Sequence, residues 1–119
     1  MKQKVHSVSY LAKAEFEFKN GVYDLVALPT GAEVAKVSLE VVGNPTVGTV
    51  SVGFKDETQK NYFLTLENTQ NNKNATSAKD YTATSNKIVV AEVKNANGTD
   101  VKGVLRVLYF LPSVIEVEY

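Results

Sequence analysis

The chain has 119 residues, and its 13 Lys and Arg balance 13 Asp and Glu beside one His and no Cys. This length fits a single domain, residues 1–119, whose core needs no disulfide or metal for stability. The lack of Cys excludes disulfides, thiolate zinc sites and iron–sulfur clusters, and one His excludes a multi-histidine metal site. A net charge of zero gives no bulk attraction to nucleic acid.

The N-terminal residues show no targeting signal. A secretory signal needs an apolar stretch of about 7–15 residues, which Ser7, Ser9 and Lys13 interrupt here. No run approaches the roughly 18 apolar residues that span a bilayer. We therefore expect a protein without a membrane partner that stays in the cytosol or is assembled there, where the lack of Cys suits reducing conditions.

Apolar and polar residues alternate with period two along most of the chain, which predicts half-solvated strands of an antiparallel sheet. The alternating runs are residues 14–19, 34–41, 49–54 and 115–119. In the second run, Val37, Leu39 and Val41 are expected to face the core. Residues 87–93 and 101–111 are apolar on both faces, so we expect central strands that are covered on both sides or lie in a subunit interface.

Turn signals separate these runs at intervals of about ten residues, as expected for a sandwich or barrel. The Asn-Gly pairs at residues 20–21 and 97–98 are strong hairpin signals, and the second pair lies between the two most apolar strands. No window has a helical stripe, and residues 55–61 are expected to form a loop. The pattern predicts an all-β fold, an antiparallel β-sandwich of about eight or nine strands.

Residues 67–80 differ from the rest because they are polar, rich in Asn and without apolar periodicity. A loop this long in a compact domain is either functional or mobile, and Asn and Ser favour turns over ladders. The segment is therefore either a flexible surface loop or a partner-contacting loop at one end of the sandwich, where such loops cluster. The candidate contact residues are Asn68, Gln70, Asn71, Asn72 and Asn74.

The sequence predicts no catalytic, cofactor or metal site. His6 alternates with Val8 and Tyr10 as in an ordinary strand, and no nucleophile or orienting partner accompanies it. The serines are scattered outside any Gly-x-Ser-x-Gly motif, and no glycine-rich phosphate loop is present. The adjacent acids at residues 56–57 lack the spacing of a calcium loop. A packing or binding role is therefore favoured over an enzyme.

The 6 tyrosines leave an alternative function open. They are numerous enough to build a platform on which sugar rings stack. In this alternative the chain is a carbohydrate- or ligand-binding β-sandwich module, the tyrosines and the loop at residues 67–80 form its site, and a host glycan is its partner. In alternating strands, however, a tyrosine more often lies in the core or at its rim.

Residues 24–41 contain a Leu-Pro-Thr-Gly-Ala turn followed by a strand, and they resemble a recurring phrase in tailed-bacteriophage and prophage structural proteins. Val52-Gly53, the pair Phe63-Leu64 and the apolar strand at residues 103–110 follow in the same order. The resemblance covers residues 22–111. It implies a jelly-roll-like sandwich of a head decoration, head-fibre or tail component, and such components are non-enzymatic and often trimeric.

Two segments depart from that pattern. Residues 67–80 are longer than expected, and residues 4–20 form an extra predicted hairpin, which is either an assembly arm or two more strands of the sandwich. The resemblance otherwise implies a homotrimer that binds other virion proteins and resides in the virion after assembly in the bacterial cytoplasm. It transfers no catalytic residue and no cofactor.

Overall fold

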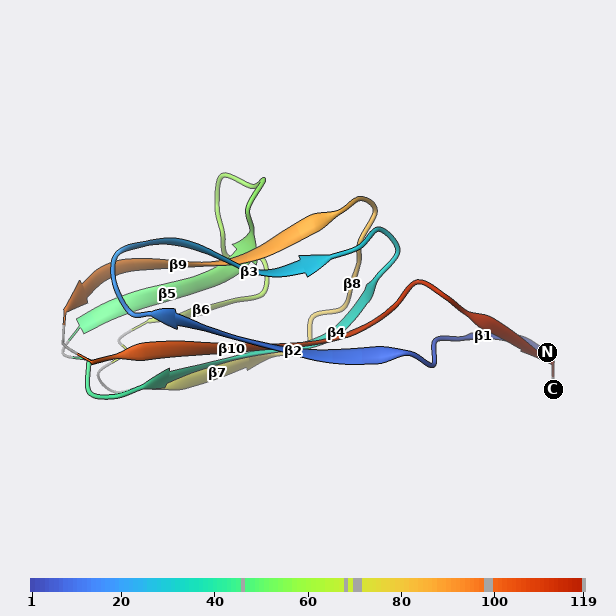
Figure 1. Ribbon diagram of the computed structural model, residues 1–119, viewed down its shortest axis with the longest axis horizontal. Helices are drawn as coiled ribbons and strands as arrows, with labels where there is room; N and C mark the ends of the chain where they lie inside the picture. The colour runs from blue at the N-terminus through green and yellow to red at the C-terminus, as the bar shows by residue number, and fades with distance from the viewer. Residues whose placement is uncertain (46, 68, 70–71, 98–99, 119) are drawn as a thin grey trace.

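The computed structural model describes residues 1–119 apart from 46, 68, 70, 71, 98, 99 and 119. All regular secondary structure within the described residues is β-strand, as the period-two patterning predicts (Figure 1). The strands are β1 (Lys2–Val5), β2 (Ser9–Glu17), β3 (Gly21–Leu28), β4 (Glu33–Val42), β5 (Val47–Phe54), β6 (Leu64–Leu66), β7 (Asn74–Ser77), β8 (Tyr81–Thr82), β9 (Lys87–Asn97), β10 (Lys102–Phe110) and β11 (Ile115–Glu118). In this part of the chain no helix is long and apolar enough to cross a membrane.

A five-stranded and a four-stranded antiparallel sheet pack face to face (Figure 1). The first has the order β2-β10-β4-β7, with β8 also paired to β4, and the second has the order β3-β9-β5-β6. Each sheet therefore takes strands from both halves of the chain, which is the crossed connectivity of a jelly roll. The predicted all-β antiparallel sandwich is confirmed. The number of strands exceeds eight or nine because two short pieces that the patterning does not predict, β7 and β8, add to the predicted set.

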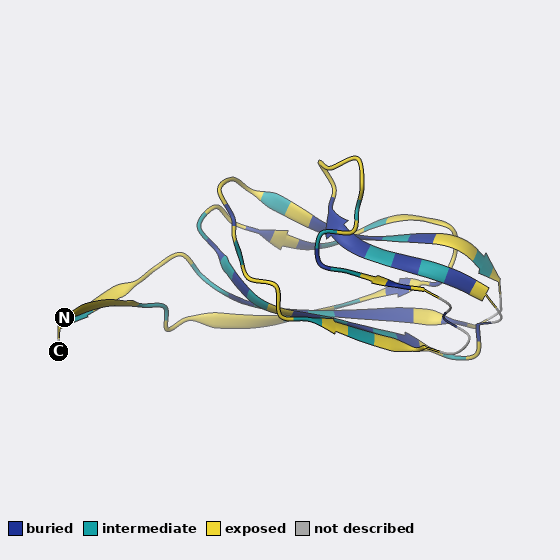
Figure 2. Cartoon of the chain, turned by 180° about the vertical axis from the view of Figure 1, so that it is seen from behind, coloured by how far each residue is buried: buried dark blue, intermediate teal, exposed yellow. Residues whose placement is uncertain are grey.

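The two strands predicted to be central occupy central positions. Strand β9 lies between β3 and β5, and β10 lies between β2 and β4. The side chains between the sheets form one apolar core, in which Val37, Leu39 and Val41 are buried as predicted (Figure 2). Residues 55–61 form a loop, also as predicted.

Neither Asn-Gly pair makes a hairpin, so both hairpin predictions are wrong. Strands β2 and β3 belong to different sheets, and so do β9 and β10, so each connection crosses the sandwich from one sheet to the other. At the first crossing Phe18 is buried between the sheets, and its amide donates to the Val101 carbonyl at 3.0 Å. The Asn20 side chain then accepts a hydrogen bond from the Ala96 amide at 2.7 Å. Burial of Phe18 thus overrides the local turn signal. Gly98 lies outside the described residues.

Residues 4–20 do not fold as the predicted hairpin either. Strand β1 pairs with β11, and β2 pairs with β10. Between these two pairs the Leu111 amide donates to the Val8 carbonyl at 2.8 Å, so β1 and β11 prolong the β2–β10 pair beyond the sandwich. The two strands form a ribbon that projects from one end of the body and carries both termini (Figures 1 and 2). We call β1 and β11 together the terminal ribbon.

Candidate functional site

The terminal ribbon has two chemically different faces. Lys2 lies opposite Glu118 and Lys4 opposite Glu116, so all four charges share one face. A diagonal ion pair joins Lys2 Nζ to Glu116 Oε1 at 3.5 Å. The charges on this face therefore compensate each other within the ribbon.

The other face of the ribbon is mainly apolar. Val5 lies opposite Ile115 and Gln3 lies opposite Val117. None of these four residues carries a charge, and Ile115 is 57% exposed. We call Gln3, Val5, Ile115 and Val117 the apolar face of the ribbon. The strands of the body turn their apolar side chains into the core, whereas the apolar face of the ribbon lies outside that core.

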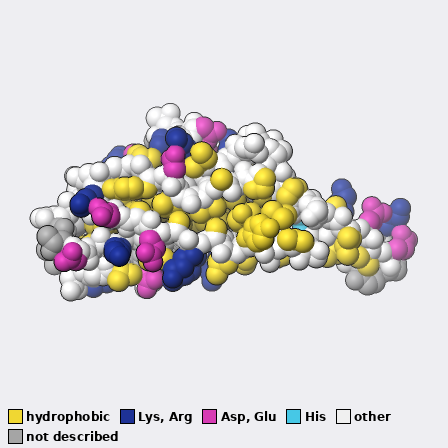
Figure 3. Space-filling view, in the orientation of Figure 1, with side chains coloured by type: hydrophobic (Ala, Val, Ile, Leu, Met, Phe, Trp, Pro, Cys, Tyr) yellow, Lys and Arg dark blue, Asp and Glu magenta, His cyan; other side chains and the backbone are white. Residues whose placement is uncertain are grey.

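Further exposed apolar side chains lie where the ribbon leaves the sandwich. They are Val8, Tyr10, Leu11 and Val114, which are between 43% and 63% exposed. Figure 3 shows hydrophobic side chains gathered at this narrowing end of the body and again along the ribbon. Exposed apolar side chains gathered at one end of a domain commonly mark an interaction site.

His6 fixes the base of the ribbon. Its Nδ1–H donates to the Leu111 carbonyl at 2.9 Å, and the ring is half-buried. His6 lies in the connection between β1 and β2 and not in a strand, so the predicted strand position is wrong. The ring ties the N-terminal connection to the segment that leads into β11, a structural contact that period-two alternation does not reveal.

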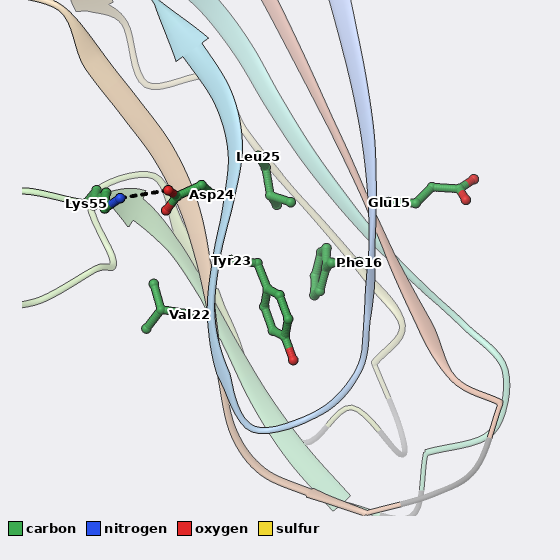
Figure 4. A pocket seen from close by; sticks show the side chains of 7 residues that line it. All are labelled: Glu15, Phe16, Val22, Tyr23, Asp24, Leu25 and Lys55. Carbon is green, nitrogen blue, oxygen red and sulfur yellow. Dashed lines mark hydrogen bonds and ion pairs between the residues drawn. The ribbon is translucent and has the colours of Figure 1, made fainter.

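A second candidate surface lies along the open edge of the sandwich, between β2 and β3 (Figure 4). In the described part of the chain each of these strands has a partner on one side only. An open groove of about 580 Å³ runs here, lined by Glu15, Phe16, Val22, Tyr23, Asp24, Leu25 and Lys55. The rings of Phe16 and Tyr23 stack with centroids 5.4 Å apart, and Lys55 Nζ lies 2.7 Å from Asp24 Oδ2. The stacked rings close the core between the two sheet edges.

The segment proposed as a partner-contacting loop is only partly a loop. Asn68, Gln70 and Asn71 lie outside the described residues, whereas Asn72 and Asn74 are both exposed. Asn74 begins β7, which pairs with β4, and the Val41 amide donates to the Lys73 carbonyl at 2.7 Å. The prediction of an unbroken loop over residues 67–80 is therefore wrong. Strand β7 lies at a sheet edge with one side in water, so it needs no run of large apolar residues.

The described residues bring together no metal-binding set. No group of three or more His, Asp or Glu side chains there is arranged to hold a metal ion. Asp56 bonds to Lys87 Nζ at 2.5 Å, and this hydrogen bond lowers the pKa of the Asp56 carboxyl below its usual range and raises the pKa of Lys87. The pair ties the loop after β5 to the start of β9, which is a structural role.

The tyrosines do not share one surface. Tyr62 and Tyr81 pack with Phe54 and Phe63 in a cluster of rings whose centroids lie 4.6–6.4 Å apart. Tyr109 is 8% exposed, and only Tyr10 among the tyrosines described is more than half exposed, at 51%. This spread gives the carbohydrate-binding alternative no stacking platform among the described residues.

Comparison with known proteins identifies the kind of protein to which these surfaces belong. A chain in the acidic-stable capsid structure of Helicobacter pylori bacteriophage KHP30 is 77% identical, the match covers 100% of both chains, and the TM-score is 0.95. The chain belongs to this family of phage capsid proteins. No family model and no curated protein matches it.

A second capsid structure shares the fold of this phage capsid family. A chain in the capsid asymmetric unit of cyanophage Pam1 is 22% identical, with 87% of this chain and 85% of that chain covered and a TM-score of 0.69. At that identity the likeness concerns the fold alone. The resemblance to phage structural proteins found in the sequence is confirmed, and the chain is a structural, capsid-associated protein.

Proposed function

We propose that this chain is a non-enzymatic subunit of the phage head that self-associates as a homotrimer and binds the capsid shell. The observation that carries the proposal is the 77% identity, over both full lengths, to a chain in the KHP30 capsid structure. The head is favoured over the tail because both matched structures are capsids. The virion is accordingly its final location, after assembly in the bacterial cytoplasm.

The physical support for self-association is surface that the single chain leaves uncovered. Ile115 on the apolar face is exposed to water, as are the apolar side chains at the base of the ribbon, whereas Val5 and Val117 are half-buried. Burying apolar surface contributes about 25 cal/mol per Å², so repeated contacts of this kind stabilise a particle without covalent links. The chain has no Cys, so disulfides contribute nothing to these contacts.

The test combines a solution measurement with a binding measurement. Purified protein is expected to sediment as a trimer, and a monomer at every micromolar concentration would contradict self-association. The protein is then mixed with phage shells that lack it, and the shells are pelleted. We expect co-sedimentation that saturates at a fixed ratio to the shell protein. Binding to purified tails but not to shells would refute the placement in the head.

A further inference from the structure

The terminal ribbon is incomplete as an isolated unit. It has two strands of four residues each, and an isolated two-stranded ribbon is marginally stable in water at best. Within the described residues β1 and β11 pair with each other and with no strand of the sandwich. Figure 2 shows the ribbon exposed beyond the end of the body. The Val8–Leu111 hydrogen bond ties the ribbon to the β2–β10 pair at its base, and a surface that covers its apolar face would stabilise it further.

The match to the KHP30 capsid chain includes this ribbon. It covers 100% of both chains at a TM-score of 0.95, so a chain within an assembled capsid has nearly the same overall course. The extended ribbon is therefore compatible with the assembled state, and it has no need to fold back onto its own sandwich.

The charges of the ribbon indicate what covers it. Lys2 and Lys4 face Glu116 and Glu118 across the two strands, so no net side-chain charge is left to attract a strongly acidic or basic surface. A nucleic-acid contact would need uncompensated basic side chains, and an anionic membrane would need a basic polar face. The apolar face, by contrast, can meet an identical face without bringing like charges together. Charge complementarity thus favours a second copy of this chain.

We infer that copies of this chain bind one another through the apolar face of the ribbon, an inference that rests on the proposed self-association. Ribbons arranged around a symmetry axis turn Val5, Ile115 and Val117 inward and keep the Lys and Glu side chains in water. Val8 and Val114, which lie at the base of the ribbon, are also exposed, at 43% and 44%. The contact is apolar, so added salt leaves it intact.

Two neighbouring residues of β11 provide a matched pair of variants. Ile115 is 57% exposed, and the Glu116 side chain, on the opposite face, is 56% exposed. Ile115→Ser removes an apolar group from the contact, whereas Glu116→Ser removes a similarly exposed charged group from the water-facing side. Both variants leave the sandwich core untouched, and thermal unfolding followed by circular dichroism verifies this.

The readout is the oligomeric state across a dilution series, measured by sedimentation velocity. With three copies of the side chain in one contact, we expect Ile115→Ser to raise the trimer dissociation constant roughly a hundredfold and Glu116→Ser to change it less than about threefold. The wild-type trimer should persist from low to molar salt. This combination supports the inference.

The remaining outcomes separate the inference from the proposed function. A wild-type trimer that Ile115→Ser leaves intact would refute the ribbon contact and leave self-association standing. A trimer that Glu116→Ser disrupts as strongly as Ile115→Ser would refute an apolar contact. A wild-type monomer would refute self-association, and loss of shell binding by Ile115→Ser alone would then assign the ribbon to the shell protein.

Discussion

Gly103 in β10 lies directly opposite Phe16 in β2, and the Phe16 ring covers the space where a side chain at Gly103 would begin. A methyl group at this position would collide with the ring. The ring has little room to yield, because it is buried in the core and stacks on Tyr23 across the open edge. Gly103→Ala therefore overpacks the place where the two sheets meet.

The magnitude follows from two opposing effects. Overpacking a buried site costs about 1–3 kcal/mol, whereas replacing Gly by Ala in a strand recovers about 0.5–1 kcal/mol of backbone conformational entropy. We expect Gly103→Ala to lower the free energy of unfolding by about 1–2 kcal/mol. In a domain of this size that corresponds to a fall in Tm of roughly 4–8 °C.

Urea unfolding at a fixed low protein concentration measures the effect apart from self-association. A double-mutant cycle with Phe16→Leu tests its cause. The smaller side chain should remove most of the penalty of Gly103→Ala, which gives a coupling energy of about 1 kcal/mol. A Gly103→Ala variant as stable as the wild type, or a penalty that Phe16→Leu leaves unchanged, would refute the reasoning.

Three further predictions concern the core, the pH dependence and the alternative function. Leu105→Ala, at a fully buried position in β10, should lower the free energy of unfolding by about 2–5 kcal/mol in urea, and a loss below 1 kcal/mol would contradict the packing. The pKa of Asp56 is lowered in the folded state, so its pair with Lys87 stabilises fully above pH about 4 and ceases to do so as the pH falls through the lowered value. The Tm difference between wild type and Asp56→Asn should therefore shrink on acidification, and a difference constant from pH 7 to pH 2 would oppose this. On a glycan array the wild type should give no signal that depends on Tyr10. A signal that Tyr10→Ala abolishes would revive the carbohydrate-binding alternative.

The fold class could be predicted because each strand carries its own evidence. Alternation identifies strands with one wet face, and the two apolar runs identify central strands, since a strand covered on both sides needs apolar residues on both. The strand partners were harder to predict. An Asn-Gly pair marks a turn, but burial of Phe18 decides whether the next strand stays in the same sheet or crosses to the other.

The terminal ribbon was missed because its strands lie at opposite ends of the chain. Lys2 and Lys4 alternate with Gln3 and Val5, while Glu116 and Glu118 alternate with Ile115 and Val117. Opposite charges on two strands of equal length are a signal for pairing, yet many other strands are nearer in sequence. Strand β7 was missed for a different reason, because an edge strand of small polar residues resembles a loop when judged by hydrophobicity.

The position of the ribbon within the topology connects the fold to the proposed role. Its two strands lead directly into β2 and β10, and β10 is paired along its whole length, Lys102–Phe110, with β2 on one side and β4 on the other. Tension applied through a ribbon held by neighbouring copies therefore loads these ladders along the strand axis, where many hydrogen bonds resist together. A ribbon attached to short edge strands such as β6 or β7 would load few bonds and would peel from the sheet. The contact surface that we infer is thus attached to the most extensively paired strand of the sandwich.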